Sequence, residues 1–125
     1  MHRWEIALPK KTLKTFKTEA EFERAFVNVI SSRGWGVSPR LTCRGGGWPD
    51  RQAIINGITV YLEFKLNKNR AELSTKQKKV KAMLEDKGAL YFVVHQDNKF
   101  EVTKKLLEIS YSLEGDVKWT SLFEV

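Results

Sequence analysis

Residues 48–65 read WPDRQAIINGITVYLEFK, and the predicted fold is built outward from this segment. The dipeptide Asn56-Gly57 in its middle is the strongest short signal for a two-residue β-hairpin turn. The segments on either side, 51–55 and 58–66, are rich in the apolar and β-branched residues of strands. We therefore predict two antiparallel strands joined by a tight turn.

The turn also sets the register of the two strands. In a two-residue loop the flanking residues pair, and counting outward from them places Asp50 opposite Glu63. Directly opposed residues have Cβ atoms roughly 4.5–5.5 Å apart. Two carboxylates at that separation repel each other, and a divalent cation would turn the repulsion into a binding site. A bulge near Pro49 would shift this register by one residue.

A lysine joins the two acids on the same face. Lys65 follows Glu63 by two residues, so both side chains project from one face of the strand. The alternate residues form an unbroken apolar row that must face the core: Val60, Leu62, Phe64 and Leu66. The polar face at this end of the hairpin is therefore predicted to carry Asp50, Glu63 and Lys65.

These residue types have the chemistry that phosphodiester hydrolysis requires. Carboxylate oxygens prefer a hard cation, so we expect Mg²⁺ or Mn²⁺ held by Asp50, Glu63 and the backbone carbonyl of Phe64. Such an ion acidifies a bound water and offsets charge on the reacting phosphate. Lys65 would orient or activate the water, or neutralise developing negative charge. The alternative for Glu63 and Lys65 is a surface salt bridge.

The composition favours a nucleic-acid partner. The chain of 125 residues contains 22 Lys and Arg against 15 Asp and Glu, which gives a net charge of +7. A surplus of this size indicates a polyanionic partner, although a well-solvated basic surface is the alternative. Cys43 is the only cysteine, which excludes an intrachain disulfide and a thiolate zinc cluster. A reducing cytoplasm is therefore the expected location.

A helix is predicted upstream of the hairpin, from Thr18 to Gly34. Thr18 is a suitable N-cap, and Glu21 three residues later completes a capping-box motif. Apolar residues follow at helical spacing: Phe22, Ala25, Phe26, Val29 and Ile30. Residues 1–17 are basic and unpatterned, so we expect a basic N-terminal arm followed by one domain over residues 18–125.

Further elements are predicted downstream. Ser74 and Gln77 form a second capping box, which begins a helix that ends at Gly88. Residues 89–94 are a continuous apolar run, as expected of a strand buried on both faces. A short helix near 104–110 and a strand after Asp116 complete the order. Helix, hairpin, helix and strand predict an α/β fold with a mixed central sheet flanked by helices.

At this point the motifs resemble a known nuclease family. Pro49-Asp50, followed after a hairpin by Glu63-Phe64-Lys65, resembles the PD-(D/E)-x-K nuclease superfamily. Four segments are similar to a stand-alone VRR-NUC (virus-type replication-repair nuclease) domain, a family common in phages: 47–50, 61–65, 73–77 and Gly88. The resemblance covers about residues 18–94. It implies a restriction-endonuclease-like αβββαβ core and Mg²⁺- or Mn²⁺-dependent cleavage of DNA.

The resemblance also implies roles for individual residues. Asp50 and Glu63 would be metal ligands, and Lys65 would be the catalytic lysine. Gln77 matches the family's glutamine on the second helix, where its amide would reach Lys65 or a phosphate. Its alternative role is the capping of Ser74, and both roles stay open at this point.

The family places a further acid on the first helix. The matching residue is Glu19, three positions before Phe22, which would hold a metal-bound water or a second ion. Glu23 lies on nearly the same helix face and is the rival residue. A solvated acidic first turn, favoured by the helix dipole, is the alternative for both.

Other residues near the motifs are predicted to contact DNA. They are Arg44, Trp48, Arg51, Lys68, Arg70 and Lys76. For Trp48, packing under the adjacent loop is the alternative. The run Gly45-Gly46-Gly47 is expected to allow close backbone approach to DNA or to the metal site.

The sequence thus predicts an endonuclease that cleaves DNA, either by nicking it or by acting on branched or junction structures. The viral stand-alone forms resemble Holliday-junction resolvases, which implies a homodimer. The alternatives are a nucleic-acid-binding module that has the fold without catalysis, and a nuclease that acts on RNA.

Overall fold

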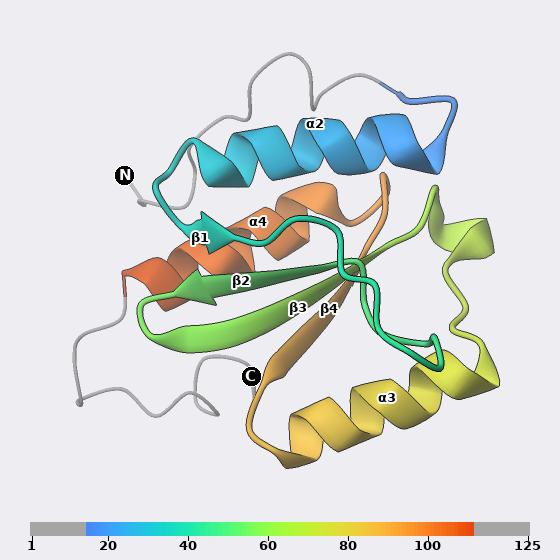
Figure 1. Ribbon diagram of the computed structural model, residues 1–125. Helices are drawn as coiled ribbons and strands as arrows, with labels where there is room; N and C mark the ends of the chain where they lie inside the picture. The colour runs from blue at the N-terminus through green and yellow to red at the C-terminus, as the bar shows by residue number, and fades with distance from the viewer. Residues whose placement is uncertain (1–14, 112–125) are drawn as a thin grey trace.

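The computed structural model describes residues 15–111 (Figure 1). The helices and strands follow one another in this order: α2 (Glu19–Ser31), β1 (Gly36–Val37), β2 (Arg51–Ile55), β3 (Ile58–Phe64), the short 3-10 helix η1 (Lys68–Arg70), α3 (Thr75–Asp86), β4 (Leu90–Val94) and α4 (Lys99–Ser110). Most of the expected basic arm and the strand expected after Asp116 lie outside the described residues.

The four strands form one mixed sheet in the order β1-β2-β3-β4. The β1–β2 and β2–β3 pairs are antiparallel, whereas β3 and β4 run parallel. Figure 1 shows α2 and α4 on one side of the sheet and α3 on the other. The prediction of an α/β fold with a mixed sheet between helices is therefore confirmed.

The hairpin has the predicted register. Ile55 pairs with Ile58 across the turn, and the ladder runs outward to the pair Arg51 and Leu62. Asn56 has a φ of 52° and Gly57 a φ of 79°, the positive values that a type I′ turn requires. Continued by two residues, the register would pair Phe64 with Pro49, which has no N–H to donate. The regular ladder therefore stops just before the predicted site.

The main core lies between the sheet and the two helices on its first side. It is formed by apolar residues of α2, the strands and α4: Phe22, Phe26, Ile30, Ala53, Ile55, Val60, Leu62, Phe64, Val94, Val102, Leu106 and Ile109. The apolar row predicted for β3 is thus confirmed through Phe64, while Leu66 lies beyond the strand and is half-buried. Phe16, which the sequence assigned to the arm, packs against this core, with its ring centroid 6.1 Å from that of Phe22.

Both predicted N-caps are present. The Thr18 hydroxyl oxygen accepts a hydrogen bond from the backbone N–H of Glu21, and Ser74 and Gln77 form a complete capping box. These caps fix where α2 and α3 begin, because they satisfy backbone N–H groups that have no partner inside the helix.

One prediction about the later elements was wrong, and one holds in part. α4 begins at Lys99 rather than near residue 104, because Val102 and Thr103 are buried and extend its inner face toward the N-terminus. In β4, Tyr91 and Val94 lie on opposite faces of the strand and both are buried, with Val94 in the main core and the ring of Tyr91 5.6 Å from Nζ of Lys81 in α3. Both faces of the strand are therefore covered in part. Its place at the edge of the four-stranded sheet leaves the other residues half-exposed. Within residues 15–111, no helix is long and apolar enough to cross a membrane.

Candidate active site

Asp50 closes the end of the hairpin where the backbone ladder stops. Its Oδ2 accepts a hydrogen bond from the backbone N–H of Phe64 at 2.8 Å, in place of the carbonyl that a continued strand would supply. Its own carbonyl accepts from the backbone N–H of Leu41 at 2.8 Å. In a strand the N–H and C=O of one residue point to the same side, so the Phe64 carbonyl also faces the Asp50 side of β3.

Glu63 is a buried carboxylate in the middle of the site. Only 4 % of the residue is exposed, and its Oε2 lies 3.5 Å from Nζ of Lys65. Its other oxygen, Oε1, is buried without a hydrogen-bond partner among the described residues. Burial and the nearby charge of Asp50 raise the pKa of Glu63 to about 7. The side chain is therefore an acid whose negative charge the ammonium group of Lys65 offsets only in part.

Gln77 connects α3 to these residues. Its Nε2 donates to Oε2 of Glu63 at 3.1 Å, and its Oε1 accepts from Nζ of Lys65 at 3.3 Å. The same Oε1 also accepts from the backbone N–H of Ser74 at 2.9 Å. The two roles that the sequence left open for Gln77, capping and contact with the site, are thus performed by one side chain.

The two acids of α2 have different surroundings. Glu23 is 3 % exposed and accepts hydrogen bonds from Arg40 at 3.0 Å and from Arg51 at 2.8 Å. Arg40 also donates to Oδ1 of Asp50 at 3.1 Å. Glu23 therefore anchors the segment before β2 to α2. The side chain of Arg51, predicted to contact DNA, is directed to this buried acid.

Glu19 lies at the first turn of α2, within electrostatic range of Asp50 and Lys65. Burial, followed by the charge of Asp50, raises the pKa of Glu19. Burial also raises the pKa of Asp50, where it outweighs the opposing effect of the hydrogen bond from the backbone N–H of Phe64. No ion pair or hydrogen bond of the Glu19 carboxylate is present in the described part of the chain. Glu19, rather than Glu23, is thus the helix acid left available to a ligand.

The glycine run packs on the start of α3. A Cβ at Gly47 would lie 2.6 Å from Cγ of Lys76 and 3.1 Å from its carbonyl oxygen, and Gly47 has a φ of +81°. Nζ of Lys76 in turn donates to the carbonyl of Gly45. The close backbone approach expected of these glycines is therefore made to helix α3. This packing fixes the segment that leads into Trp48, Pro49 and Asp50.

The other predicted DNA contacts lie around this centre. Arg44, Lys68, Arg70 and Lys76 are exposed. Trp48 is half-buried, and its ring meets that of Tyr61 edge-on at 6.1 Å between centroids. Trp48 therefore forms a wall beside the site and does not project freely into solvent.

Tyr91 is a neighbour of the site that the sequence analysis missed. It pairs with Tyr61 in the parallel register of β3 and β4, two positions from the pair formed by Glu63 and Val93 and therefore on the same face of the sheet. Its hydroxyl is buried without a hydrogen-bond partner in the described chain, and its pKa is raised by burial and by Glu63. In the sequence Tyr91 is one apolar-run residue among several, and only the parallel pairing places it near Glu63.

The donor groups fit a hard cation. Among residues 15–111 there is no cluster of three or more His, Cys, Asp or Glu side chains arranged to hold a metal ion. The hairpin end offers two carboxylates, Asp50 and Glu63, together with the Phe64 carbonyl. The unpartnered Oε1 of Glu63 is the kind of buried polar atom that a cation would satisfy.

Comparisons of the chain with protein-family models, with curated proteins and with solved structures found no match. The function is therefore inferred from the arrangement and chemistry of these residues.

Proposed function

We propose that this protein is a metal-dependent nuclease that hydrolyses phosphodiester bonds in DNA. The observation that carries the proposal is the environment of Glu63, a buried carboxylate with one oxygen unpartnered among residues 15–111. Asp50 lies beside it, and Lys65 and Gln77 contact its other oxygen. Glu63 is buried and Asp50 half-buried, and Lys65 and Arg40 offset only part of their charge. A bound cation would offset the rest.

Asp50, Glu63 and the Phe64 carbonyl would hold Mg²⁺ or Mn²⁺, since all three supply oxygen ligands. When bound, the ion would lower the pKa of a coordinated water and offset charge on the phosphate. Asp50 already accepts from Phe64 and Arg40. Each carboxylate oxygen has a second lone pair, so these contacts leave room for coordination.

Lys65 would act on the reacting phosphate from a fixed position. Its ammonium group is held between Oε2 of Glu63 and Oε1 of Gln77, at 3.5 Å and 3.3 Å. An ammonium group has three protons, so one remains for a phosphate oxygen or the attacking water. Gln77 is a positioning residue in this scheme, because it orients Lys65 and Glu63 without touching the substrate.

The arrangement of elements supports the finer family assignment. The order α2-β1-β2-β3-α3-β4 is the order of a restriction-endonuclease-like αβββαβ core. Under this proposal Asp50, Glu63 and Lys65 would have the roles that the VRR-NUC resemblance implies, and Glu19 would hold a metal-bound water. The exposed side chains of four basic residues would contact DNA phosphates: Arg44, Lys68, Arg70 and Lys76. The net charge of +7 would favour binding to DNA in general. We further propose that the protein acts in the cytoplasm as a homodimer, and that it nicks DNA or cleaves branched or junction structures.

A substrate panel tests this function. The full chain is incubated with Mg²⁺ or Mn²⁺ and with labelled duplex DNA, a four-way DNA junction, RNA of matched sequence and free nucleotides. Cleavage of DNA that stops when the metal is chelated is the expected result. Cleavage of RNA alone would contradict the DNA assignment. Salt-sensitive DNA binding without cleavage under either metal would identify a binding module in place of an enzyme.

A further inference from the structure

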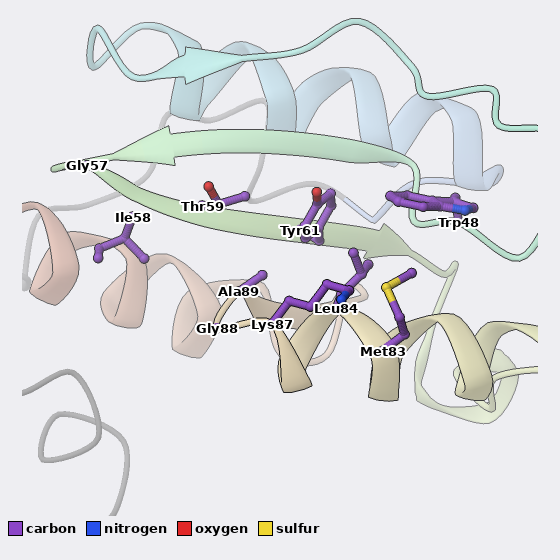
Figure 2. A pocket seen from close by; sticks show the side chains of 10 residues that line it. All are labelled: Trp48, Gly57, Ile58, Thr59, Tyr61, Met83, Leu84, Lys87, Gly88 and Ala89. Atoms are coloured by element: carbon purple, nitrogen blue, oxygen red, sulfur yellow. The ribbon is translucent and has the colours of Figure 1, made fainter.

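A pocket opens beside the proposed active site, between the sheet and α3. It has a volume of about 630 Å³ and is walled mainly by apolar and aromatic side chains. Figure 2 shows Trp48 and Tyr61 on the sheet side, with Met83 and Leu84 of α3 facing them. Thr59 and Lys87 add a hydroxyl and an ammonium group to its lining. The nuclease chemistry proposed above uses none of these six residues.

Two residues that line the pocket are near neighbours in sequence of the acidic centre. Tyr61 precedes Glu63 by two residues and projects from the same face of β3, and Trp48 precedes Asp50 by two residues. Two residues of a strand span roughly 7 Å. A nucleotide whose phosphate lies at Asp50 and Glu63 would therefore have its own base, or that of its neighbour, within reach of the pocket.

The walls have the chemistry of a base-binding pocket. The rings of Trp48 and Tyr61 meet edge-on at 6.1 Å, so neither ring covers both faces of the other, and a base could stack on a face that the pair does not use. The thioether of Met83 on the opposite wall is a polarisable contact for a flat aromatic group. Stacking of bases on aromatic side chains is the usual way in which proteins hold unpaired nucleotides.

The charge of α3 suits a nucleic-acid strand at this opening. The helix presents exposed lysines at 76, 78 and 79, and Lys87 at its end lines the pocket. Phosphates on either side of an inserted base would lie near this positive surface. A base inside a duplex is stacked between its neighbours and cannot enter such a pocket without being extruded.

We propose that this pocket binds an unpaired nucleobase next to the phosphodiester bond that is cut. The inference rests on the proposed nuclease function and names its substrate class: DNA with an unpaired nucleotide at a flap, gap or branch. Trp48 and Tyr61 are then specificity-determining residues, because they contact the base and not the reacting phosphate.

Binding without cleavage gives the direct test. The probes are a labelled duplex with a short single-stranded flap and the same duplex with one abasic residue at each of the first unpaired positions in turn. Anisotropy is measured with the full chain in EDTA. We expect the abasic residue at one position to weaken binding roughly 5- to 100-fold, the range that stacking of one base supplies.

Two variants and a control assign the effect to the pocket. Trp48→Ala should bind the flap and abasic probes with equal affinity. Met83→Ala, on the opposite wall, should reduce the difference in affinity between the two probes, and it serves as the test if Trp48→Ala does not fold. Phe100→Ala removes an aromatic side chain of α4 that is 51 % exposed and should leave the difference unchanged.

The outcomes separate this inference from the one on which it rests. DNA cleavage by the wild type with equal affinity for every probe would overturn the base pocket and leave the nuclease standing. A preference for the intact flap that persists in both Trp48→Ala and Met83→Ala would also overturn it. Absence of both DNA binding and DNA cleavage would overturn the two proposals together.

Discussion

The side-chain amide of Gln77 donates a hydrogen bond to Oε2 of Glu63 at 3.1 Å and thereby joins the first turn of α3 to β3. Through its Oε1 the same side chain accepts from the backbone of Ser74 and from Lys65. One residue therefore fixes the start of a helix and the position of two groups in the proposed active site.

These two roles of Gln77 can be separated by substitution. Gln77→Glu keeps a side chain that suits the capping box, but it replaces the donating amide with an oxygen facing Glu63. We expect kcat to fall roughly 10- to 100-fold, as for loss of an outer contact to a metal ligand. Ser74→Ala should lower the free energy of unfolding by about 1 kcal/mol and leave kcat nearly unchanged. Steady-state kinetics and thermal unfolding measure both effects, and equal loss of kcat in the two variants would contradict the assignment.

The raised pKa of Glu63 predicts how stability depends on pH without metal. Because the pKa is about 7 in the folded protein against an ordinary 4.5, the folded state binds this proton more tightly than the unfolded chain. The free energy of unfolding should therefore fall as the pH rises through this interval. Glu63→Gln removes this titrating group. As the pH rises from about 4.5 to about 7, the free energy of unfolding of the variant should therefore increase by on the order of 3 kcal/mol relative to that of wild type.

Unfolding in denaturant and EDTA at about pH 4.5 and about pH 8 measures this difference. Glu72→Gln is the matched control, because its side chain is 88 % exposed. A difference in stability between wild type and Glu63→Gln that stays constant with pH would contradict the raised pKa of this buried carboxylate.

The two acids of α2 should respond differently to the same substitution. Glu23→Gln leaves Arg40 and Arg51 without their buried partner and should cost roughly 2 kcal/mol of stability. Glu19→Gln breaks no ion pair in the described chain and should leave stability unchanged or higher, while DNA cleavage falls. Chemical unfolding and cleavage rates of both variants test this division. DNA cleavage by Glu19→Gln at the wild-type rate would show that Glu19 has no role in the proposed active site.

The packing of the glycine run on α3 predicts a difference between neighbouring glycines. Gly46 and Gly47 both have positive φ, at +73° and +81°, so alanine at either position carries a backbone penalty of roughly 1 kcal/mol. Only at Gly47 would the added Cβ also collide with Lys76. Gly47→Ala should therefore be less stable than Gly46→Ala and should show lower cleavage, because the shift reaches Asp50. Equal melting temperatures of Gly46→Ala and Gly47→Ala would contradict the close contact between Gly47 and Lys76.

Much of this arrangement is local in the sequence, and that part was predictable. The turn Asn56-Gly57 fixes the hairpin register, which places Asp50 near Glu63 before any tertiary contact is known. The caps at Thr18 and Ser74 likewise depend on residues three positions away.

The parts that were missed depend on contacts between distant segments. The burial of Glu23 depends on Arg40 and Arg51 reaching it from another element. The place of Tyr91 depends on the parallel pairing of β4 with β3. The partial exposure of β4 depends on its place at the edge of the sheet, which an apolar run in the sequence does not reveal. α4 starts earlier than predicted because the burial of Val102 and Thr103 extends the helix to Lys99. No capping motif in the sequence indicates this start.

The most direct measurement is the metal-dependent cleavage of a four-way junction and a supercoiled plasmid by wild type and Asp50→Asn. Asparagine can still accept the hydrogen bond from Phe64, so the variant should fold, but it offers a poorer ligand to a hard cation. Asp86→Asn, an exposed residue of α3, is the matched control. The account predicts cleavage by wild type and Asp86→Asn with Mg²⁺ or Mn²⁺, and at least ~100-fold less by Asp50→Asn. Cleavage by Asp50→Asn at the wild-type rate, or no cleavage by wild type with either metal, would contradict it.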